Sequence, residues 1–199
     1  MQIPFSPPDI SELEIEQVTE ALRSGWITTG PRTKELEKRL AGFCHTSKVV
    51  CLNSATAAEE LNLRILGIGE GDEVIVPAYT YTATAAAVIH VGAKVIFIDS
   101  QIDNVEMDYI ALEKAITEKT KAIVAVYLGG IICDYNSIFE IVEKKKKLFR
   151  ACNDIQKAIG RVAVLADCAH ALGASKDGKM AGEIADFTSF SFHAVKNFT

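Results

Sequence analysis

Six short apolar runs, each bounded by turn residues, do most to restrict the fold of this chain. Most of them are followed by a segment with helical periodicity, and they read KVVCLN, DEVIVPA, AKVIFID, KAIVAVYLG, RVAVLADC and FTSFSFH. The runs are apolar almost throughout rather than at alternate positions, which is typical of parallel strands covered by helices on both faces. The sequence therefore predicts an α/β fold with a parallel sheet of about six or seven strands.

Two amphipathic helices are predicted ahead of these runs. Asp9 or Ser11 can cap the first, and Gly25 is a natural stop for it. The second helix places three apolar residues on one face: Leu36, Leu40 and Phe43.

Four consecutive lysines at 144–147 lie in a long connection between Asp134 and Asp167. They could form a nucleotide-binding patch. The apolar residues Ile141 and Leu148 on either side favour the alternative, which is a helix with a solvated charged face.

Net charge and cysteine content limit the partners and the compartment. The formal net charge of −5 argues against broad binding to nucleic acid or to an anionic membrane, because either would need a basic face. The five cysteines form no CxxC pair and are odd in number, so the sequence indicates neither a metal site nor a disulfide framework. The N-terminus does not read as a signal peptide, and no apolar stretch is long enough to span a membrane. We therefore expect a cytoplasmic protein.

A phosphate site is predicted where the run KVVCLN passes through Ser54, Ala55, Thr56 and Ala57 into a helix. Ligands of open α/β sheets bind outside the carboxyl ends of the strands. The start of a helix offers unpaired N–H groups and the positive end of the helix dipole, and the hydroxyls of Ser54 and Thr56 lie beside them. The alternative is an ordinary N-cap without a ligand.

Two further candidate residues follow the strand VAVLA. A carboxylate at Asp167 is costly to bury unless a cation or several donors meet it, and a protonated pyridine nitrogen is such a cation. His170 could hydrogen-bond the same ligand. The alternatives are a helix cap or a buried acceptor for Asp167, and a core contact for His170.

Three more candidates lie in other loops. Tyr81 follows the strand DEVIVPA among small residues, where its ring could stack on a flat ligand or simply pack. Lys196 could condense with a carbonyl as a Schiff base if its ammonium is desolvated, or it could remain a solvated charge. Ser191 could add a hydroxyl to a phosphate site or be a plain strand serine.

Together these residues specify a ligand with three parts: a phosphate, a flat ring whose nitrogen pairs with a carboxylate, and a carbonyl for a lysine. Pyridoxal 5′-phosphate has all three, and it is held by a lysine with an acidic partner at the pyridine nitrogen. We therefore predict pyridoxal 5′-phosphate as the cofactor.

Five segments of the chain resemble, in order, the DegT/DnrJ/EryC1/StrS family of sugar aminotransferases, which are pyridoxal-phosphate enzymes of fold type I. The segments are GWITTGPRTKELEKRLA, LNSATAAEELNLRILGIGEGDEVIVPAYTYTATAAAVIHVGAKVIFID, KTKAIVAVYLGG, LADCAHALGA and SFSFHAVKN. The resemblance implies a three-layer αβα fold with a mostly parallel, seven-stranded sheet, like the large domain of aspartate aminotransferase. It also implies that residues 1–199 form the N-terminal and large cofactor-binding domain, and that the family's small C-terminal domain lies outside this chain.

The same resemblance implies a role for each candidate residue. Lys196 matches the family's Schiff-base lysine, and Asp167 matches the partner of the pyridine nitrogen. His170 lies where the family has Gln or His near the phenolic oxygen, and Tyr81 matches the ring-stacking aromatic residue. The remaining matches are Ala55, Thr56 and Ser191 for the phosphate, and Thr28, Thr29 and Gly30 for the sugar nucleotide. The family's usual SGTAAL reads SATAAE here, with alanine in place of the glycine.

The activity that the resemblance implies is transfer of an amino group, by family habit from glutamate, to a keto sugar linked to a nucleotide. The product would serve surface polysaccharide or amino-sugar biosynthesis, and the enzyme would be a homodimer. Two alternatives stay open: a truncated or non-catalytic cofactor-binding domain, and a pyridoxal-phosphate-dependent sugar dehydratase. A nicotinamide dehydrogenase is disfavoured, because no GxGxxG follows the first strand.

Overall fold

Five parallel strands form the central sheet of the protein, whose computed structural model describes residues 7–198. The strands are β1 (Glu73–Pro77), β2 (Lys94–Ile98), β3 (Thr120–Val126), β4 (Ala163–Asp167) and β7 (Phe187–Ser189). Their order across the sheet is β2-β1-β3-β4-β7, and every pairing is parallel. The α/β fold with a parallel sheet, expected from the apolar runs, is confirmed.

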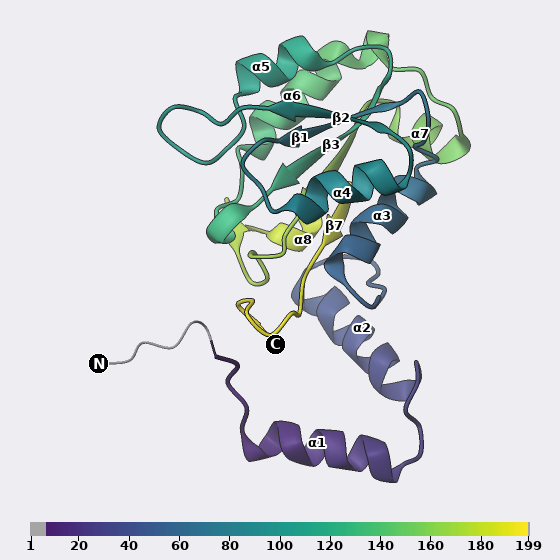
Figure 1. Ribbon diagram of the computed structural model, residues 1–199, viewed down its shortest axis with the longest axis vertical. Coiled ribbons are helices and arrows are strands. Elements are labelled where there is room, and N and C mark those ends of the chain that lie inside the picture. Colours follow the sequence, from purple (N-terminus) through teal and green to yellow (C-terminus); the bar gives the residue numbers. More distant parts are fainter. Residues whose placement is uncertain (1–6, 199) are drawn as a thin grey trace.

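Helices cover both faces of this sheet (Figure 1). One face carries α3 (Ala55–Ile65) and α4 (Thr82–His90), and the other carries α5 (Tyr109–Ala115) and α6 (Tyr135–Lys145). Shorter elements complete the chain: α7 (Asp154–Ile159), α8 (Ala181–Ile184), the 3-10 turns η1 (Leu128–Gly130) and η2 (Lys146–Leu148), and the antiparallel pair β5 (Ser175–Lys176) and β6 (Lys179–Met180).

Alternate residues of the strands pack into two separate hydrophobic clusters, one on each face of the sheet. Val74 and Val76 pack in the same cluster as Leu63 of α3, whereas Ile75 packs in the cluster that contains Leu112 of α5. Because successive side chains of a strand point to opposite faces, both sets must be apolar when both faces are covered. This requirement explains why the strand sequences are apolar almost throughout.

The two N-terminal helices form as predicted but bury no residue. Ser11 caps α1 (Glu12–Arg23) by accepting a hydrogen bond from the Leu13 N–H at 3.2 Å, and Gly30 begins α2 (Pro31–Phe43). In Figure 1, α1 lies apart from the sheet and is joined to it through α2. The expected apolar face of α1 is therefore solvent-exposed, and Val18 retains 61% of its accessible surface.

Two expectations about the strands are wrong. The sheet contains five strands within residues 7–198, not the six or seven expected, and the run KVVCLN at 48–53 is irregular chain outside the sheet. A strand needs a hydrogen-bonding neighbour as well as β-branched residues, but Cys51 N–H donates to the Glu37 side chain of α2 at 2.9 Å. In the last run, only Phe187–Ser189 pairs with β4, and the chain then leaves the sheet.

The four lysines at 144–147 lie at the end of a helix and just after it, as expected for the solvated charged face predicted from Ile141 and Leu148. Lys144 and Lys145 end α6, and both contact Glu113 of α5, with the closer Nζ–Oε1 distance at 2.6 Å. Lys146 pairs with Glu143 one turn back at 2.8 Å. The lysines at 144–146 thus pair with carboxylates of the same layer.

Truncating the core at Leu63 is expected to destabilise the fold strongly. Leu63 of α3 is 1% exposed and packs between α4 and the sheet. Replacing it with alanine should therefore lower the free energy of unfolding by about 2–5 kcal/mol, measured by denaturant titration. Leu61 of the same helix is 37% exposed, and its alanine variant serves as the matched control. Equal losses in the two variants would contradict this packing.

Candidate functional site

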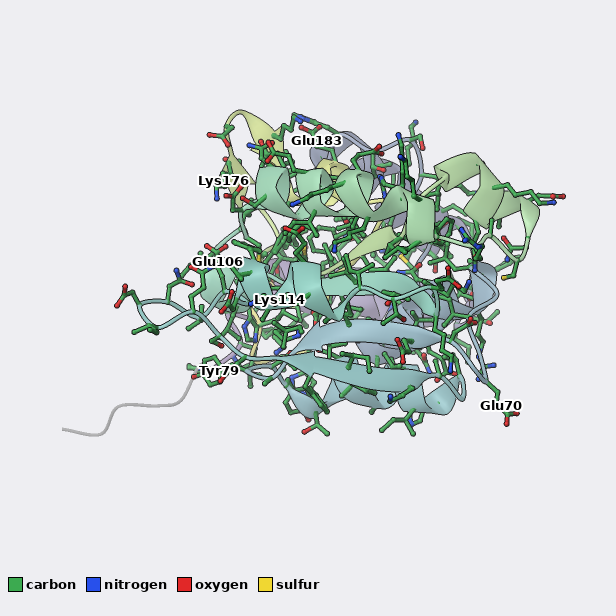
Figure 2. All side chains as sticks on the ribbon, turned by 90° about the horizontal axis from the view of Figure 1, so that it is seen from above. Glu70, Tyr79, Glu106, Lys114, Lys176 and Glu183 are labelled. Atoms are coloured by element: carbon green, nitrogen blue, oxygen red, sulfur yellow. The ribbon has the colours of Figure 1, made fainter. Side chains whose placement is uncertain are left out.

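The carboxyl ends of three strands meet at one edge of the sheet. Asp167, the last residue of β4, is in register with Val126 of β3 and Ser189 of β7. Figure 2 shows the polarity of the sheet: Tyr79, just after β1, and Glu70, just before it, lie at opposite ends. A cleft of about 1090 Å³ opens at this region, and its lining includes all the residues predicted to contact the cofactor: Ala55, Thr56, Tyr81, Asp167, His170, Ser191 and Lys196.

Asp167 is a buried carboxylate held by neutral donors. Its side chain is on the sheet face that carries α3 and α4, and the residue is 5% exposed. Oδ2 accepts from the Thr84 hydroxyl of α4 at 2.8 Å, and Oδ1 accepts from the Ala169 N–H at 3.1 Å. Thr80 lies 2.9 Å from the Thr84 hydroxyl and supports it. Within residues 7–198, no lysine, arginine or histidine forms an ion pair with Asp167. The carboxylate therefore remains able to neutralise a cationic ligand group.

The Lys196 amine and the His170 ring lie in contact in the cleft. Lys196 Nζ lies 2.9 Å from His170 Nε2, and the Gly129 N–H points at His170 Nδ1 at 3.3 Å. Burial and then the charge of Lys196 lower the pKa of His170, while Asp167 opposes them. Because Nδ1 accepts from Gly129, the proton of the neutral ring is on Nε2. Nε2 then faces the Lys196 amine across the 2.9 Å contact.

Two local hydrogen bonds fix the loop that carries Lys196. The Lys196 N–H donates to the His193 carbonyl at 2.8 Å, which closes a turn. The Asn197 side-chain amide donates to the Leu172 carbonyl at 2.7 Å, in the loop that follows β4. These contacts join the loops after β4 and β7, so that Lys196 and Asp167 line the same cleft.

The start of α3 supplies an anion cradle. The Ser54 hydroxyl accepts from the Ala57 N–H at 3.1 Å, and the Ser54 carbonyl accepts from the Ala58 N–H at 3.1 Å. The N–H groups of Ala55 and Thr56 precede these and have no acceptor within the helix. Ser54 is thus the ordinary N-cap of the alternative interpretation, and the helix end still presents donors to the cleft.

The other two predicted cofactor contacts, Tyr81 and Ser191, also line the cleft but differ in solvent exposure. Tyr81 is the residue before α4, and 74% of its surface is exposed, so its ring is free to cover a flat ligand. Ser191 is half-buried, and its hydroxyl accepts from the His193 N–H at 3.3 Å. The serine hydroxyl can still donate to a phosphate, because that contact uses only a lone pair.

The three predicted substrate residues lie elsewhere. Thr28, Thr29 and Gly30 precede α2 and do not line the cleft of their own chain. Along α2 the cleft lining begins at Leu40, which at the usual helical rise lies roughly 15 Å beyond Gly30. The Trp26 indole N–H donates to the Thr29 carbonyl at 3.2 Å, and a Cβ at Gly30 would clash with that indole. Their contact with substrate stays a prediction.

Polar residues behind the cleft were not among the sequence-based candidates. Thr84 is 1% exposed, Ser189 is 2% exposed and accepts from the Asn62 amide at 3.2 Å, and Glu59 is 6% exposed. Helical periodicity could have identified Glu59, because it precedes buried Leu63 by four residues and so shares its face. Nothing in the sequence paired it with β4.

Several other kinds of site can be assessed for residues 7–198. No group of three or more His, Cys, Asp and Glu side chains is arranged to hold a metal ion, and the five cysteines are free thiols. None of the helices in this range has the length and apolar character needed to cross a membrane.

The cleft residues fit the three-part ligand expected from the sequence. The α3 start suits a phosphate, the buried Asp167 carboxylate suits a protonated ring nitrogen, and the Lys196 amine suits a carbonyl. All three line one cleft. The arrangement can therefore hold a phosphorylated pyridine aldehyde and activate it.

Comparison with known proteins agrees with this fit. SpsC, a spore coat polysaccharide biosynthesis protein of Bacillus subtilis, is 40% identical over 195 residues, which cover 98% of this chain and 46% of SpsC. The UDP-4-amino-4-deoxy-L-arabinose–oxoglutarate aminotransferase of Shewanella sediminis is 39% identical over 99% of this chain and 47% of that protein. The chain thus spans about half the length of these relatives.

A solved structure is more similar still. Spr1654 of Streptococcus pneumoniae, described as a sugar aminotransferase, has been determined in apo, pyridoxamine-phosphate and pyridoxal-phosphate forms. In the pyridoxal-phosphate form it is 61% identical with a TM-score of 0.99, over 100% of this chain and 51% of Spr1654. The sequence model of the DegT/DnrJ/EryC1/StrS aminotransferase family matches residues 8–199. This chain therefore belongs to the DegT/DnrJ/EryC1/StrS aminotransferase family.

Proposed function

We propose that this chain is the N-terminal and large cofactor-binding domain of a pyridoxal-phosphate-dependent sugar aminotransferase. The observation that carries the proposal is the convergence of Lys196, Asp167 and the start of α3 on one cleft. Support comes from Spr1654, which shares 61% of the aligned residues and was solved with pyridoxal phosphate and with pyridoxamine phosphate.

Each part of the cofactor has a counterpart among the cleft residues. The N–H groups of Ala55 and Thr56, with the Ser191 hydroxyl, would hold the phosphate. Asp167 would accept the ring N–H and keep that nitrogen protonated. Tyr81 would cover the ring face, and His170 would face the phenolic oxygen. When bound, pyridoxal phosphate supplies an aldehyde that links to amines and a ring that stabilises negative charge on the adjacent carbon.

Lys196 would act first as an anchor and then as a proton carrier. Its amine would hold the aldehyde of the bound cofactor until an amino donor releases it. The free Nζ would then move the proton at the donor carbon that bears the amino group. With the sugar substrate, the same atom would move a proton at the keto carbon. His170 keeps the amine oriented through the 2.9 Å contact.

The substrates are proposed from the relatives. One of them is named a UDP-aminoarabinose–oxoglutarate aminotransferase, and another is a spore coat polysaccharide biosynthesis protein. These names support a nucleotide-linked keto sugar as acceptor and glutamate as donor, for surface polysaccharide or amino-sugar biosynthesis. We also propose a cytoplasmic homodimer, in which a second copy covers apolar side chains that α1 leaves exposed, such as Leu13 and Leu22. Thr28, Thr29 and Gly30 would contact the sugar nucleotide there.

The proposed reaction is tested by following the transfer of the amino group from glutamate to the sugar. Purified protein loaded with pyridoxal phosphate is given glutamate and a UDP-linked 4-keto sugar, and the products are measured by mass spectrometry. We expect 2-oxoglutarate to be released and the keto oxygen of the sugar to be replaced by an amino group. A sugar that loses a hydroxyl without gaining nitrogen would identify a dehydratase. Cofactor binding without 2-oxoglutarate would identify a non-catalytic domain.

A further inference from the structure

A second carboxyl group, that of Glu59, is buried behind Asp167. Glu59 lies on the inner face of α3 and is 6% exposed. It lines both the main cleft and a separate internal cavity of about 10 Å³. The other polar walls of this small cavity come from Asn62 of the same helix, Thr84 of α4 and Ser189 of β7. Glu59 is thus enclosed by the same elements that hold Asp167.

The surroundings of Glu59 do not support a negative charge. No lysine, arginine or histidine lines the small cavity, and within residues 7–198 no ion pair involves Glu59. Among the described residues, none donates a hydrogen bond to its buried Oε2. Burying an ionised carboxylate without a cation or donors is costly, and such a group keeps its proton instead. A protonated Glu59 then needs an acceptor.

Asp167, which lines the same cleft as Glu59, is the carboxylate available to accept it. Burial, and then the charge of Asp167 and a hydrogen bond to it, raise the pKa of Glu59 to about 9. Two adjacent buried carboxyl groups cannot both ionise without strong repulsion, so they share one proton. The other titratable groups nearby are the Cys168 thiol, whose pKa burial raises, and Lys196 and His170, which line the same cleft. Since Asp167 already accepts from Thr84 and Ala169, it is the member of the pair that is better equipped to carry the charge.

We propose that Glu59 is a positioning residue for Asp167: its protonated carboxyl donates a hydrogen bond to the Asp167 carboxylate, which leaves Asp167 as the one negative charge facing the ring nitrogen of the cofactor. The proposal rests on the proposed function. A carboxylate has about four lone-pair sites. Thr84, Ala169 and Glu59 would occupy three of them and orient the fourth toward the cleft. Loss of the Glu59 proton would add a second buried negative charge at the same place.

The protonation of Glu59 can be measured without the cofactor. The protein is labelled with carbon-13 at the glutamate side-chain carboxyls and titrated by NMR, and Glu59→Gln assigns the signal by its disappearance. We expect the Glu59 signal to titrate near pH 9. Titration near the ordinary value for glutamate would overturn the proposal. Glu60→Gln is the matched control, because Glu60 lies next along the same helix but pairs with Arg64 at 2.7 Å.

The positioning role is measured by cofactor affinity, from absorbance titrations with pyridoxal 5′-phosphate. Glu59→Gln keeps the volume and an N–H donor, so its affinity at neutral pH should stay close to that of the wild type. Glu59→Leu keeps the volume but removes the donor, so its affinity should fall by about tenfold or more. Glu60→Gln should match the wild type at every pH.

A pH series separates positioning from simple packing. The wild-type affinity should change as pH passes through the range in which Glu59 titrates, and Glu59→Gln should lose that change. Identical pH profiles, or a Glu59→Leu affinity equal to that of the wild type, would overturn the proposal. If Glu59→Leu fails to fold, the Glu59→Gln profile decides. If the wild type itself fails to bind pyridoxal phosphate, the proposed function fails, whereas the NMR titration still decides whether Glu59 holds the proton.

Discussion

Replacing Lys196 with alanine is expected to abolish the absorbance band of the lysine-linked cofactor and to reduce amino transfer to background. In the proposed function the residue supplies the amine for the carbonyl and also carries the proton in both half-reactions, so its loss would remove two functions at once. The Nζ is held 2.9 Å from His170 and lines the same cleft as Asp167. The measurement is an absorbance spectrum of cofactor-treated protein before and after borohydride.

A second lysine in the cleft provides the control. Lys48 also lines it, but it lies in the extended segment before α3 and is exposed. The Lys48→Ala variant should keep both the reducible band and the activity. If the band survives in Lys196→Ala and disappears in Lys48→Ala, the cofactor is linked to Lys48, and the assignment to Lys196 is contradicted.

Replacing Asp167 with asparagine is expected to weaken cofactor binding by about two orders of magnitude or more, as removal of one partner from a buried ion pair does. Asparagine keeps the size of the side chain and can still accept from Thr84, but it carries no charge for the ring nitrogen. Activity should fall further, because an unprotonated ring stabilises negative charge less well. Affinity is measured by absorbance titration, and turnover by release of 2-oxoglutarate.

The Asp167→Asn variant also provides a second measurement, which is the pKa of Glu59. Asp167 contributes to the raised pKa of Glu59, so its neutral replacement should shift the Glu59 titration back toward the ordinary value for glutamate. Asp154→Asn is the control, because Asp154 is exposed on α7 and pairs with Lys157 at 3.0 Å. Unchanged cofactor affinity in Asp167→Asn would contradict the pairing with the ring nitrogen.

The sequence was most informative where strand periodicity and strand ends decide the outcome. The runs that contain β1 to β4 are apolar because both sheet faces are covered, and this pattern alone predicted them correctly. Asp167 was predicted at a strand end, and the register of β3, β4 and β7 brings that end to the cleft. The residues that share one cleft could be proposed because parallel strands end at one edge.

The remaining features depend on tertiary contacts that no local pattern records. The segment 48–53 has the composition of a strand, but its backbone bonds to Glu37 of α2 instead of a sheet neighbour. Helical periodicity places Glu59 on the buried face of α3, but only the packing of α3 against α4 and β7 encloses it near the end of β4. The apolar residues of α1 predicted a helix correctly, but their exposure depends on what this chain packs against.

The central claim is that Lys196 anchors the cofactor opposite Asp167. The most direct measurement is peptide mapping after borohydride reduction of protein loaded with pyridoxal 5′-phosphate. We expect the mass of one reduced pyridoxal-phosphate group on the peptide that contains Lys196, and on no other peptide. The label on a different lysine, or no label on a folded protein, would contradict the account.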